Sequence, residues 1–308
     1  MIFSDDFSRS AAKSQFWYHD SDATTVTDAN ASNRGMRERA LLSHGGEMVQ
    51  TMIPLNRYSF IEGLSDGLLP PMHFEFEITL QDDPEMIFQN DGTARRIVVN
   101  NFELWVPQLH FTGKGQIFAN ENFLKPTQWK YLKEEMNRSG PRNVVSGTWL
   151  ITPGVKNPKH VFVFLQQSRK ENSYTQNPYI FDTFDIDGDN SARLDTCLPQ
   201  YGTSFYSELD YDYNKKLRIY HDLINFRYRQ NDYNSGVQLQ IANFEKLYTI
   251  IYFDLRNTKE SVTGDPKKLE FHYRLNEAAN AQNYIIYALV LNEQEFVLKQ
   301  IGNELVAV

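Results

Sequence analysis

The chain has 308 residues, a formal net charge of −8 and 23% charged side chains. This balance excludes a disordered polyelectrolyte and disfavours nucleic-acid binding, because proteins that bind phosphate backbones carry a basic face or tail, and this sequence has none. The 17 Tyr, 21 Phe and 4 Trp residues can fill a large core and favour strands over helices. A single cysteine, Cys197, excludes an internal disulfide and a multi-thiolate metal site.

No segment predicts membrane targeting. Residues 1–6 lack the basic and apolar regions of a signal peptide. The longest apolar run, residues 284–291, has eight residues, and a membrane-spanning helix needs roughly 20. We therefore expect a soluble globular protein that is neither inserted into a membrane nor secreted by a signal peptide.

The first half of the chain predicts a long irregular segment followed by a few strands. Residues 1–47 are polar and small, and Phe16, Trp17 and Tyr18 are their candidate anchors to a core. Residues 96–99 and 102–111 predict a strand pair or one bulged strand. Over residues 73–80 apolar side chains alternate with polar ones, which is typical of a half-buried strand: Phe74, Phe76, Ile78 and Leu80.

Residues 127–136 predict a short helix, because Pro126 precedes them and Thr127 is available as an N-cap. The helix is expected to end at residues 137–141, which form the best candidate linker between two domains.

The second half has a denser strand pattern, interrupted by one amphipathic helix. Leu217, Tyr220, His221, Ile224 and Tyr228 recur at helical spacing within residues 216–229. Short strands without regularly alternating helices favour a sandwich over a parallel α/β fold, and an eight-stranded jelly roll fits best. The predicted strands are residues 144–151, 160–167, 179–186, 192–198, 237–241, 247–255, 269–275, 284–291 and 295–301.

Two motifs resemble functional sites in sequence only. Residues 63–67 match the G-x-S-x-G nucleophile elbow, but Pro70 and Pro71 prevent the helix that this elbow requires, so we interpret them as a turn. Asp185, Asp187 and Asp189 resemble the first half of a calcium loop. The EF-hand positions for Gly and Glu are held by Asn190 and Thr196, so an exposed acidic turn is the simpler interpretation and calcium binding stays open.

The remaining chemistry-bearing residues form no recognisable constellation. The seven histidines are scattered, and His73, His110, His160 and His272 each lie singly on a predicted strand, as structural histidines do. Cys197 is expected to be a small buried hydrophobe. The glycosylation sequons at Asn30 and Asn137 lack a secretory context. We therefore expect no catalytic, cofactor-binding or metal-binding residues, no cofactor and no enzymatic activity.

Aromatic side chains gather in three places that could hold a sugar-stacking platform: residues 17–18, 104–106 and 248–253. The last two alternate with other apolar residues in predicted strands, so we interpret them as core. A carbohydrate-binding or attachment module with a β-sandwich fold is the alternative function, and Trp17 and Trp129 are its candidate exposed aromatics.

Several stretches resemble the major capsid protein of the Polinton/Maverick and adintovirus-like group. The resemblance covers roughly residues 34–308 and is densest from residue 145 onward. Its motifs are structural and mark no active site. They are Ile53-Pro54-Leu55, Gly67-Leu68-Leu69-Pro70-Pro71, residues 102–107, 157–167, 176–182 and 248–255, and the apolar run 284–291.

The resemblance implies an all-β, tandem (double) jelly-roll β-sandwich with one short helix in each half. Residues 1–140 would form the first jelly roll and residues 141–308 the second. Three chains would form a pseudo-hexagonal homotrimer that tiles an icosahedral shell with neighbouring capsomers, penton proteins and minor capsid proteins. The protein would then be located in the virion, after assembly inside the host cell, with no sequence-specific nucleic-acid partner.

The sequence departs from this family at its start. The first half predicts only four or five strands, which is too few for a jelly roll. One interpretation is that residues 1–140 hold the later part of the first barrel, with earlier strands absent from this sequence. The alternative is a degenerate first barrel.

Overall fold

The computed structural model describes residues 11–22, 32–43, 47–55, 61, 75–80, 93, 96–123, 127–171, 173–182, 191–197, 213–226, 239–256, 266–275, 283–301 and 304–307. The chain divides into two compact units. The first unit comprises residues 1–53, 81–95 and 134–292, and the second comprises residues 54–80, 96–133 and 293–308.

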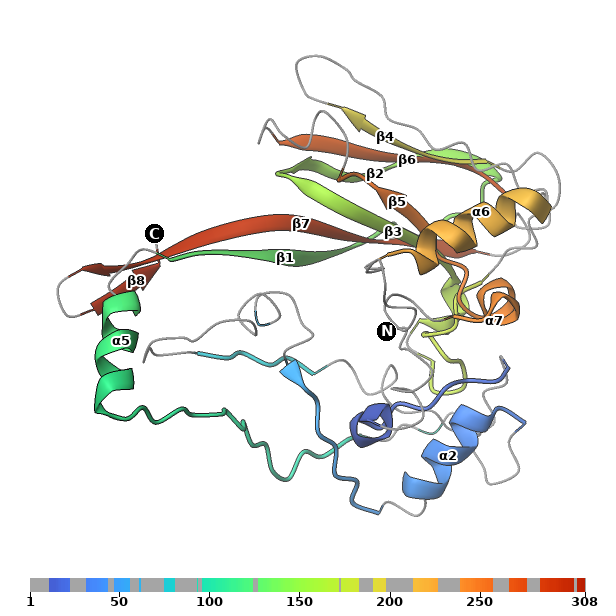
Figure 1. Ribbon diagram of the computed structural model, residues 1–308. Helices are drawn as coiled ribbons and strands as arrows, with labels where there is room; N and C mark the ends of the chain where they lie inside the picture. The colour runs from blue at the N-terminus through green and yellow to red at the C-terminus, as the bar shows by residue number, and fades with distance from the viewer. Residues whose placement is uncertain are drawn as a thin grey trace. The chain divides into compact units, whose positions relative to one another are not determined.

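The strands form two antiparallel sheets, visible as two layers in Figure 1. One sheet has the order β1-β7-β3-β5, with β8 paired to β7, and the other has the order β2-β6-β4. The strand bounds are β1 Thr127–Arg138, β2 Ser146–Val155, β3 Pro158–Gln167, β4 Ser191–Cys197, β5 Ile251–Asp254, β6 Lys267–Arg274, β7 Tyr284–Ile301 and β8 Glu304–Ala307.

The described helices are short. Asn33 begins the second of them, because its side-chain Oδ1 accepts hydrogen bonds from the backbone N–H groups of Gly35 and Met36 at 3.0 and 3.5 Å. The helix bounds are η1 Ala11–Gln15, α2 Arg34–Ser43, α5 Gly113–Phe123, η4 Ser168–Lys170, α6 Tyr213–Ile224 and α7 Ile241–Lys246.

The core of the first unit lies between the two sheets. Phe253 of β5 meets Phe271 of β6 edge to face, with ring centroids 6.4 Å apart, and Tyr273 meets Tyr284 in the same way at 6.2 Å. Aromatic pairs of this geometry add about 0.5–1.5 kcal/mol each beyond the area that they bury. The same layer contains the aliphatic side chains of Val161, Val163, Leu165, Ile286, Ala288 and Val290, all buried.

The β3–β7 pair is buried on both faces. The residues of β3 that point away from the second sheet are covered by other aromatic rings: Phe164 stacks on Phe181 at 4.2 Å and on Tyr287 at 5.5 Å. Strands buried on both faces read as continuous apolar runs, whereas β6, with one open face, alternates between buried and half-buried residues.

Four predicted strands are confirmed within a few residues, as β2, β3, β4 and β6. The predicted strand 247–255 is shorter and forms only β5. Residues 284–291 and 295–301 form one continuous strand, β7, because β3 and β8 pair with its successive parts. The predicted linker is tied to this strand, since the Ser139 N–H donates to the Ile286 carbonyl at 2.8 Å and the Arg142 N–H to that of Tyr284 at 2.8 Å.

The predicted helix at residues 127–136 is wrong, because this segment forms β1. Trp129, Tyr131 and Glu135 are half-buried, while Gln128 and Lys130 are exposed. This alternation has a period of two, and the aromatic side chains favour a pleated surface. The helix of this half that lies closest to the prediction is α5, at residues 113–123.

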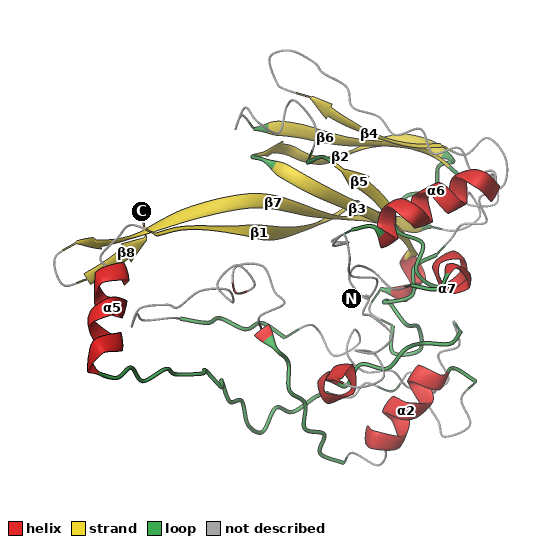
Figure 2. Ribbon diagram, in the orientation of Figure 1, coloured by secondary structure: helices red, strands yellow, loops and turns green. Residues whose placement is uncertain are grey.

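The predicted strands at residues 73–80, 96–99 and 102–111 are wrong as far as the structure describes them. Residues 75–80 and 96–111 lie outside the sheets, are exposed along their length and run as loop in Figure 2. A strand requires a neighbouring strand, and none of the described strands of this chain pairs with these segments.

The helix predicted at residues 216–229 is confirmed as α6, but its buried face differs. Ile219 and Leu223 are buried, whereas Leu217 and His221 are exposed. The predicted strand 179–186 is not formed at residues 179–182, where the chain turns, and residues 183–186 lie outside the described residues.

Two further expectations differ in part. The predicted strand 237–241 is not formed at residues 239–241, because residues 239–240 lie outside helices and strands and Ile241 begins α7. Residues 237–238 are outside the described part. The segment 1–47, expected to be irregular, contains η1 and α2.

The described chain is therefore mostly antiparallel β-structure with a few short helices, in agreement with the expected all-β sandwich. Its described strands do not close into a barrel. The expected division at residue 140 into two jelly rolls stays a prediction.

The sheet packing predicts the effect of a charge between the layers. Phe253→Asp places a carboxylate against Phe271 without a partner, so we expect it to destabilise the fold by at least about 3–5 kcal/mol or to abolish soluble protein. Urea unfolding followed by circular dichroism measures the change. Lys156→Glu, at an exposed turn position, is the control and should change stability by less than about 0.5 kcal/mol. Normal folding of the Phe253→Asp protein would contradict the assigned inward face of β5.

Candidate functional site

The two motifs that resemble functional sites lie outside the described residues. This applies to the G-x-S-x-G match at residues 63–67 and to Asp185, Asp187 and Asp189 of the acidic turn. The backbone of Cys197 ends β4, where it pairs with Lys268. Asn137 is half-buried in β1 and donates to the Glu135 carbonyl at 3.5 Å, while Asn30 is outside the described part.

The described histidines serve packing and surface contacts. His160 is buried on β3, and its Nδ1 lies 2.7 Å from the Tyr252 hydroxyl. His272 places Nδ1 3.0 Å from the Thr148 hydroxyl on the open face of the three-stranded sheet. His110 is exposed in a loop rather than in a strand. Within the described part of the chain, no group of His, Cys, Asp and Glu side chains has an arrangement that could hold a metal ion.

The most enclosed aromatic cluster surrounds His160. The ring of Phe226, directly after α6, meets His160 at 4.8 Å and Phe162 at 4.9 Å, both edge to face. Tyr252 stacks on Phe162 at 4.9 Å, and burial raises the pKa of its phenol. This cluster holds the end of α6 against the sheet.

A polar staple joins β1, η4 and β7 in the first unit. Arg138 donates two hydrogen bonds of 2.6 Å to the Glu171 carboxylate, and the Tyr287 hydroxyl donates a third at 2.8 Å. The Arg138 guanidinium holds the pKa of the Glu171 carboxyl below its usual range. Burial, together with the neighbouring carboxylate, raises the pKa of Tyr287 to about 12.

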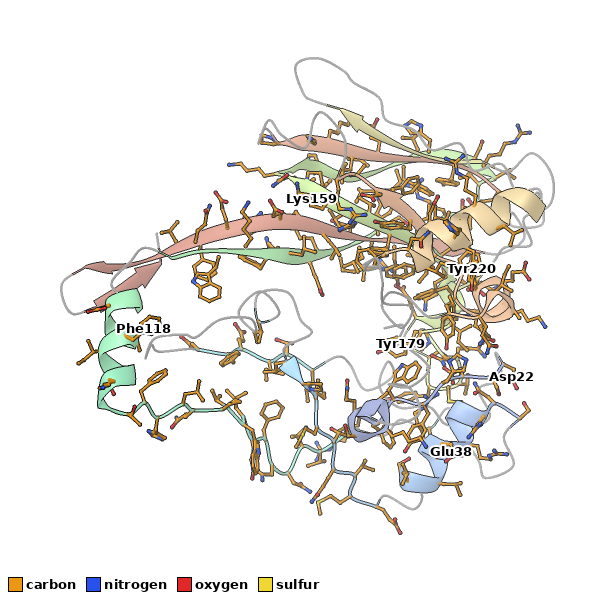
Figure 3. All side chains as sticks on the ribbon, in the orientation of Figure 1. Asp22, Glu38, Phe118, Lys159, Tyr179 and Tyr220 are labelled. Atoms are coloured by element: carbon orange, nitrogen blue, oxygen red, sulfur yellow. The ribbon has the colours of Figure 1, made fainter. Side chains whose placement is uncertain are left out.

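A buried lysine fixes the loop that follows η4. Lys170 donates to the Ile180 carbonyl at 2.8 Å and lies 3.0 Å from the Asp182 carboxylate. The other Asp182 oxygen accepts the backbone N–H of Gln167 at 2.7 Å. Because Lys170 and Asp182 bind each other and nearby backbone groups, we interpret this pair as structural. Figure 3 labels Tyr179, which this loop carries with its side chain exposed.

The N-terminal residues of the first unit are held by a second ion pair. Asp20 lies 2.7 Å from the Arg39 guanidinium of α2 and 3.4 Å from the Tyr248 hydroxyl. The neighbouring His19 places Nε2 2.8 Å from the Asn243 side chain of α7. The expected aromatic anchors Phe16, Trp17 and Tyr18 are half-buried, so the polar contacts share in holding this segment.

The feature that no packing role explains is a run of exposed apolar side chains at residues 101–111, here called the assembly segment. Trp105 is 78% exposed, Phe102 and Leu109 are each 65% exposed, and Val106 is 64% exposed. The expectation that residues 104–106 belong to the core is therefore wrong. In the same unit Ile117 and Phe118 of α5 are also exposed, and Figure 3 labels Phe118 on this helix.

Side-chain hydrogen bonds indicate that residues 101–105, the first part of the assembly segment, are extended. Asn101 donates to one oxygen of Glu103 at 2.8 Å, and the indole N–H of Trp105 donates to the other at 3.1 Å. Residues two apart share a face only in an extended chain. Asn101, Glu103 and Trp105 therefore lie on one face, and Phe102, Leu104 and Val106 lie on the other.

The sequence contained a signal for this segment that was interpreted as core. Its alternation is typical of an extended segment, and the bonds among Asn101, Glu103 and Trp105 agree with this over residues 101–105. Whether these side chains are covered depends on a neighbouring strand, and the presence of that strand cannot be predicted from the local sequence.

Comparisons with known proteins add a weak likeness to a solved structure. No protein-family model and no curated protein matches the chain. A chain in the cryo-EM structure of the Sputnik virophage is similar over 59% of this chain, with 10% sequence identity and a TM-score of 0.33. The match spans 38% of the virophage chain. A likeness at this level carries no argument about fold or function. In the described residues, no helix is long and apolar enough to cross a membrane.

The polar staple predicts a pH-dependent contribution to stability. The folded-state pKa of Glu171 is lowered, so its stabilising effect is present above the unfolded-state pKa of about 4.3 and is lost as the pH falls through the folded-state pKa. We expect Glu171→Gln to lower the free energy of unfolding by about 1 kcal/mol at pH 7, since the pair is partly exposed. The difference from wild type should vanish below about pH 3.

Urea unfolding at the two pH values measures this difference. Glu121→Gln, on the exposed surface of α5, is the control and should stay within about 0.5 kcal/mol of the wild type at both. An equal deficit of the Glu171→Gln protein at both pH values would show a packing defect instead of a lost charge.

Proposed function

We propose that the chain is a structural viral-type major capsid protein that forms trimeric, pseudo-hexagonal capsomers of an icosahedral shell, on a double jelly-roll fold. In this proposal it has no catalytic role and no cofactor. Its partners are two further copies in the trimer, neighbouring capsomers, and penton and minor capsid proteins, and its location is the virion. The chain makes no sequence-specific contact with nucleic acid.

The observation that carries the proposal is the exposed assembly segment. An aromatic side chain has about 150–250 Å² of surface, so Phe102 and Trp105 alone leave on the order of 300 Å² of it uncovered. Leu104, Val106, Leu109 and Phe111 are also exposed, so apolar surface lies on both faces of the segment. A single chain with this surface needs a macromolecular partner.

Two further features support a capsid role. The sequence resembles the major capsid protein of the Polinton/Maverick and adintovirus-like group most densely from residue 145 onward, and residues 157–167 and 284–291 of that resemblance form most of β3 and the first part of β7. Antiparallel sandwich layers are also the units from which jelly rolls are built.

The charge of the chain supports a shell component more than a nucleic-acid-binding protein. A net charge of −8 offers little attraction to phosphate, because affinity for DNA rises with the number of Lys and Arg contacts. Burying apolar surface between acidic subunits then supplies the driving force for association.

The mass of the protein in solution tests this function. Light scattering on a sizing column should give about three times the chain mass of 35.9 kDa, without decline over the micromolar range. Calcium and EDTA are compared in parallel, and a calcium-dependent mass would return attention to Asp185, Asp187 and Asp189. A strict monomer in every condition would contradict the capsomer proposal.

A second candidate function, carbohydrate binding, is favoured by one observation. Trp105 presents an open indole face next to the Glu103 carboxylate and the Asn101 amide, a combination that can stack on a sugar ring and bind its hydroxyl groups. Trp17 and Trp129 are half-buried and less suited to this role. A glycan-array signal that Trp105→Ala removes and Trp129→Ala keeps would support this candidate, and a blank array would exclude it for the glycans present.

A further inference from the structure

We propose that the assembly segment, residues 101–111, adds as a β-strand to an open sheet edge of a second copy of this chain. The inference rests on the proposed function for its biological setting, but its chemistry can be tested without a capsid. It specifies how two copies meet: main-chain hydrogen bonds fix the register, and Phe102, Trp105 and their neighbours supply the apolar contact.

The backbone of the segment is available for pairing. Among the described residues, none of the backbone–backbone hydrogen bonds outside helices and strands involves residues 101–111. An extended conformation of residues 101–105 is supported by the Asn101–Glu103–Trp105 side-chain bonds. Because less conformational freedom is lost when a pre-extended segment pairs, its association costs less than that of a disordered one.

The same chain supplies suitable edges. Within the described part of the three-stranded sheet, β2 and β4 each pair only with β6, so each presents one unpaired row of N–H and C=O groups. β2 spans ten residues, a length close to that of the assembly segment. The assembly segment of one copy can therefore pair with an open sheet edge of a second copy.

The low charge of the segment permits a second copy as the occupant. Two chains with a net charge of −8 each repel one another, and their contact is least costly where charges are few. Glu103 is the only formally charged residue in the assembly segment, and both of its oxygens already accept hydrogen bonds from Asn101 and Trp105. A basic partner protein would find only one carboxylate in this segment, so the segment offers it little electrostatic attraction.

Pro107 determines which side of the segment pairs. In an extended chain the N–H groups of alternate residues point to opposite sides, and Pro107 removes a donor from the side shared with residues 101, 103, 105, 109 and 111. Proline is tolerated in an edge strand when its nitrogen faces solvent. The pairing side is therefore the one formed by the backbone of Phe102, Leu104, Val106, Gln108 and His110.

This assignment provides a matched pair of variants. Leu104→Pro removes a donor from the pairing side, whereas Leu109→Pro removes one from the solvent side. Both positions are exposed leucines in a loop, 49% and 65% exposed, so neither change should alter the urea unfolding of the monomer by more than about 0.5 kcal/mol.

The experiment has two independent measurements. Sedimentation of the wild-type, Leu104→Pro and Leu109→Pro full chains gives their self-association constants. We expect Leu104→Pro to weaken association at least about tenfold more than Leu109→Pro does. Fluorescence anisotropy measures the binding of a labelled synthetic peptide of residues 101–111 to the full-length chain, and hydrogen exchange should show new protection in β2 or β4 when the peptide is bound.

The outcomes separate this inference from the proposed function. Trimers that both proline variants weaken equally, with no peptide binding, would overturn strand addition and leave the capsomer proposal standing. Peptide binding with protection of β2 or β4 in a chain that stays monomeric would support strand addition and overturn the trimer. Protection confined to strands other than β2 and β4 would show that another surface takes the segment, and would overturn the proposed edge.

Discussion

The antiparallel pairing of β3 with β7 is the interaction on which the rest of the described first unit depends. Val161, Val163 and Leu165 on β3 lie beside Val290, Ala288 and Ile286 on β7, and together they form the floor on which the second sheet packs. The opposite face of the same two strands carries His160, Phe162 and Phe164, which bind α6 and the loop of residues 173–182. A ribbon buried on both faces cannot shift its register by one residue without exchanging two different sets of contacts.

Polar contacts hold the ends of this ribbon where apolar packing stops. The Tyr284 hydroxyl donates to the Val144 carbonyl and lies 3.2 Å from the Tyr273 hydroxyl, which itself accepts from Arg142. Burial raises the pKa of the Tyr284 phenol, so it stays a neutral donor throughout the physiological range. The Arg138–Glu171–Tyr287 staple likewise holds β7, at Tyr287, to its neighbours in the first unit. These groups hold the described strands of the first unit together.

An element could be predicted from the sequence where its own residues determine its structure, and could not where pairing with a distant segment determines it. The strands β3 and β6 could be predicted because burial determines their residue types. β3 is buried on both faces and is almost continuously apolar, whereas β6 is buried on one face and alternates. The β1 segment could not be assigned in this way, since Leu132 and Tyr131 fit a helical face as well as a strand, and pairing with β7, distant in sequence, decides between them. The candidate site was mispredicted for the opposite reason. Residues 101–111 have a strand-like sequence, but whether they pair depends on a strand distant in sequence, which the local residues do not specify.

An uncovered strand in an acidic protein invites uncontrolled aggregation, and the assembly segment contains two features that restrict it. Pro107 interrupts one row of donors, so the segment cannot extend a sheet from both of its sides and cannot seed an endless ladder. Glu103, which accepts hydrogen bonds from Asn101 and Trp105, places a carboxylate on the same face as the Trp105 ring. A strand that can pair on one side only, in a chain whose net charge opposes unspecific contact, allows closed assemblies of few copies and disfavours fibres. This combination fits the proposed role of the chain as a subunit of a finite shell.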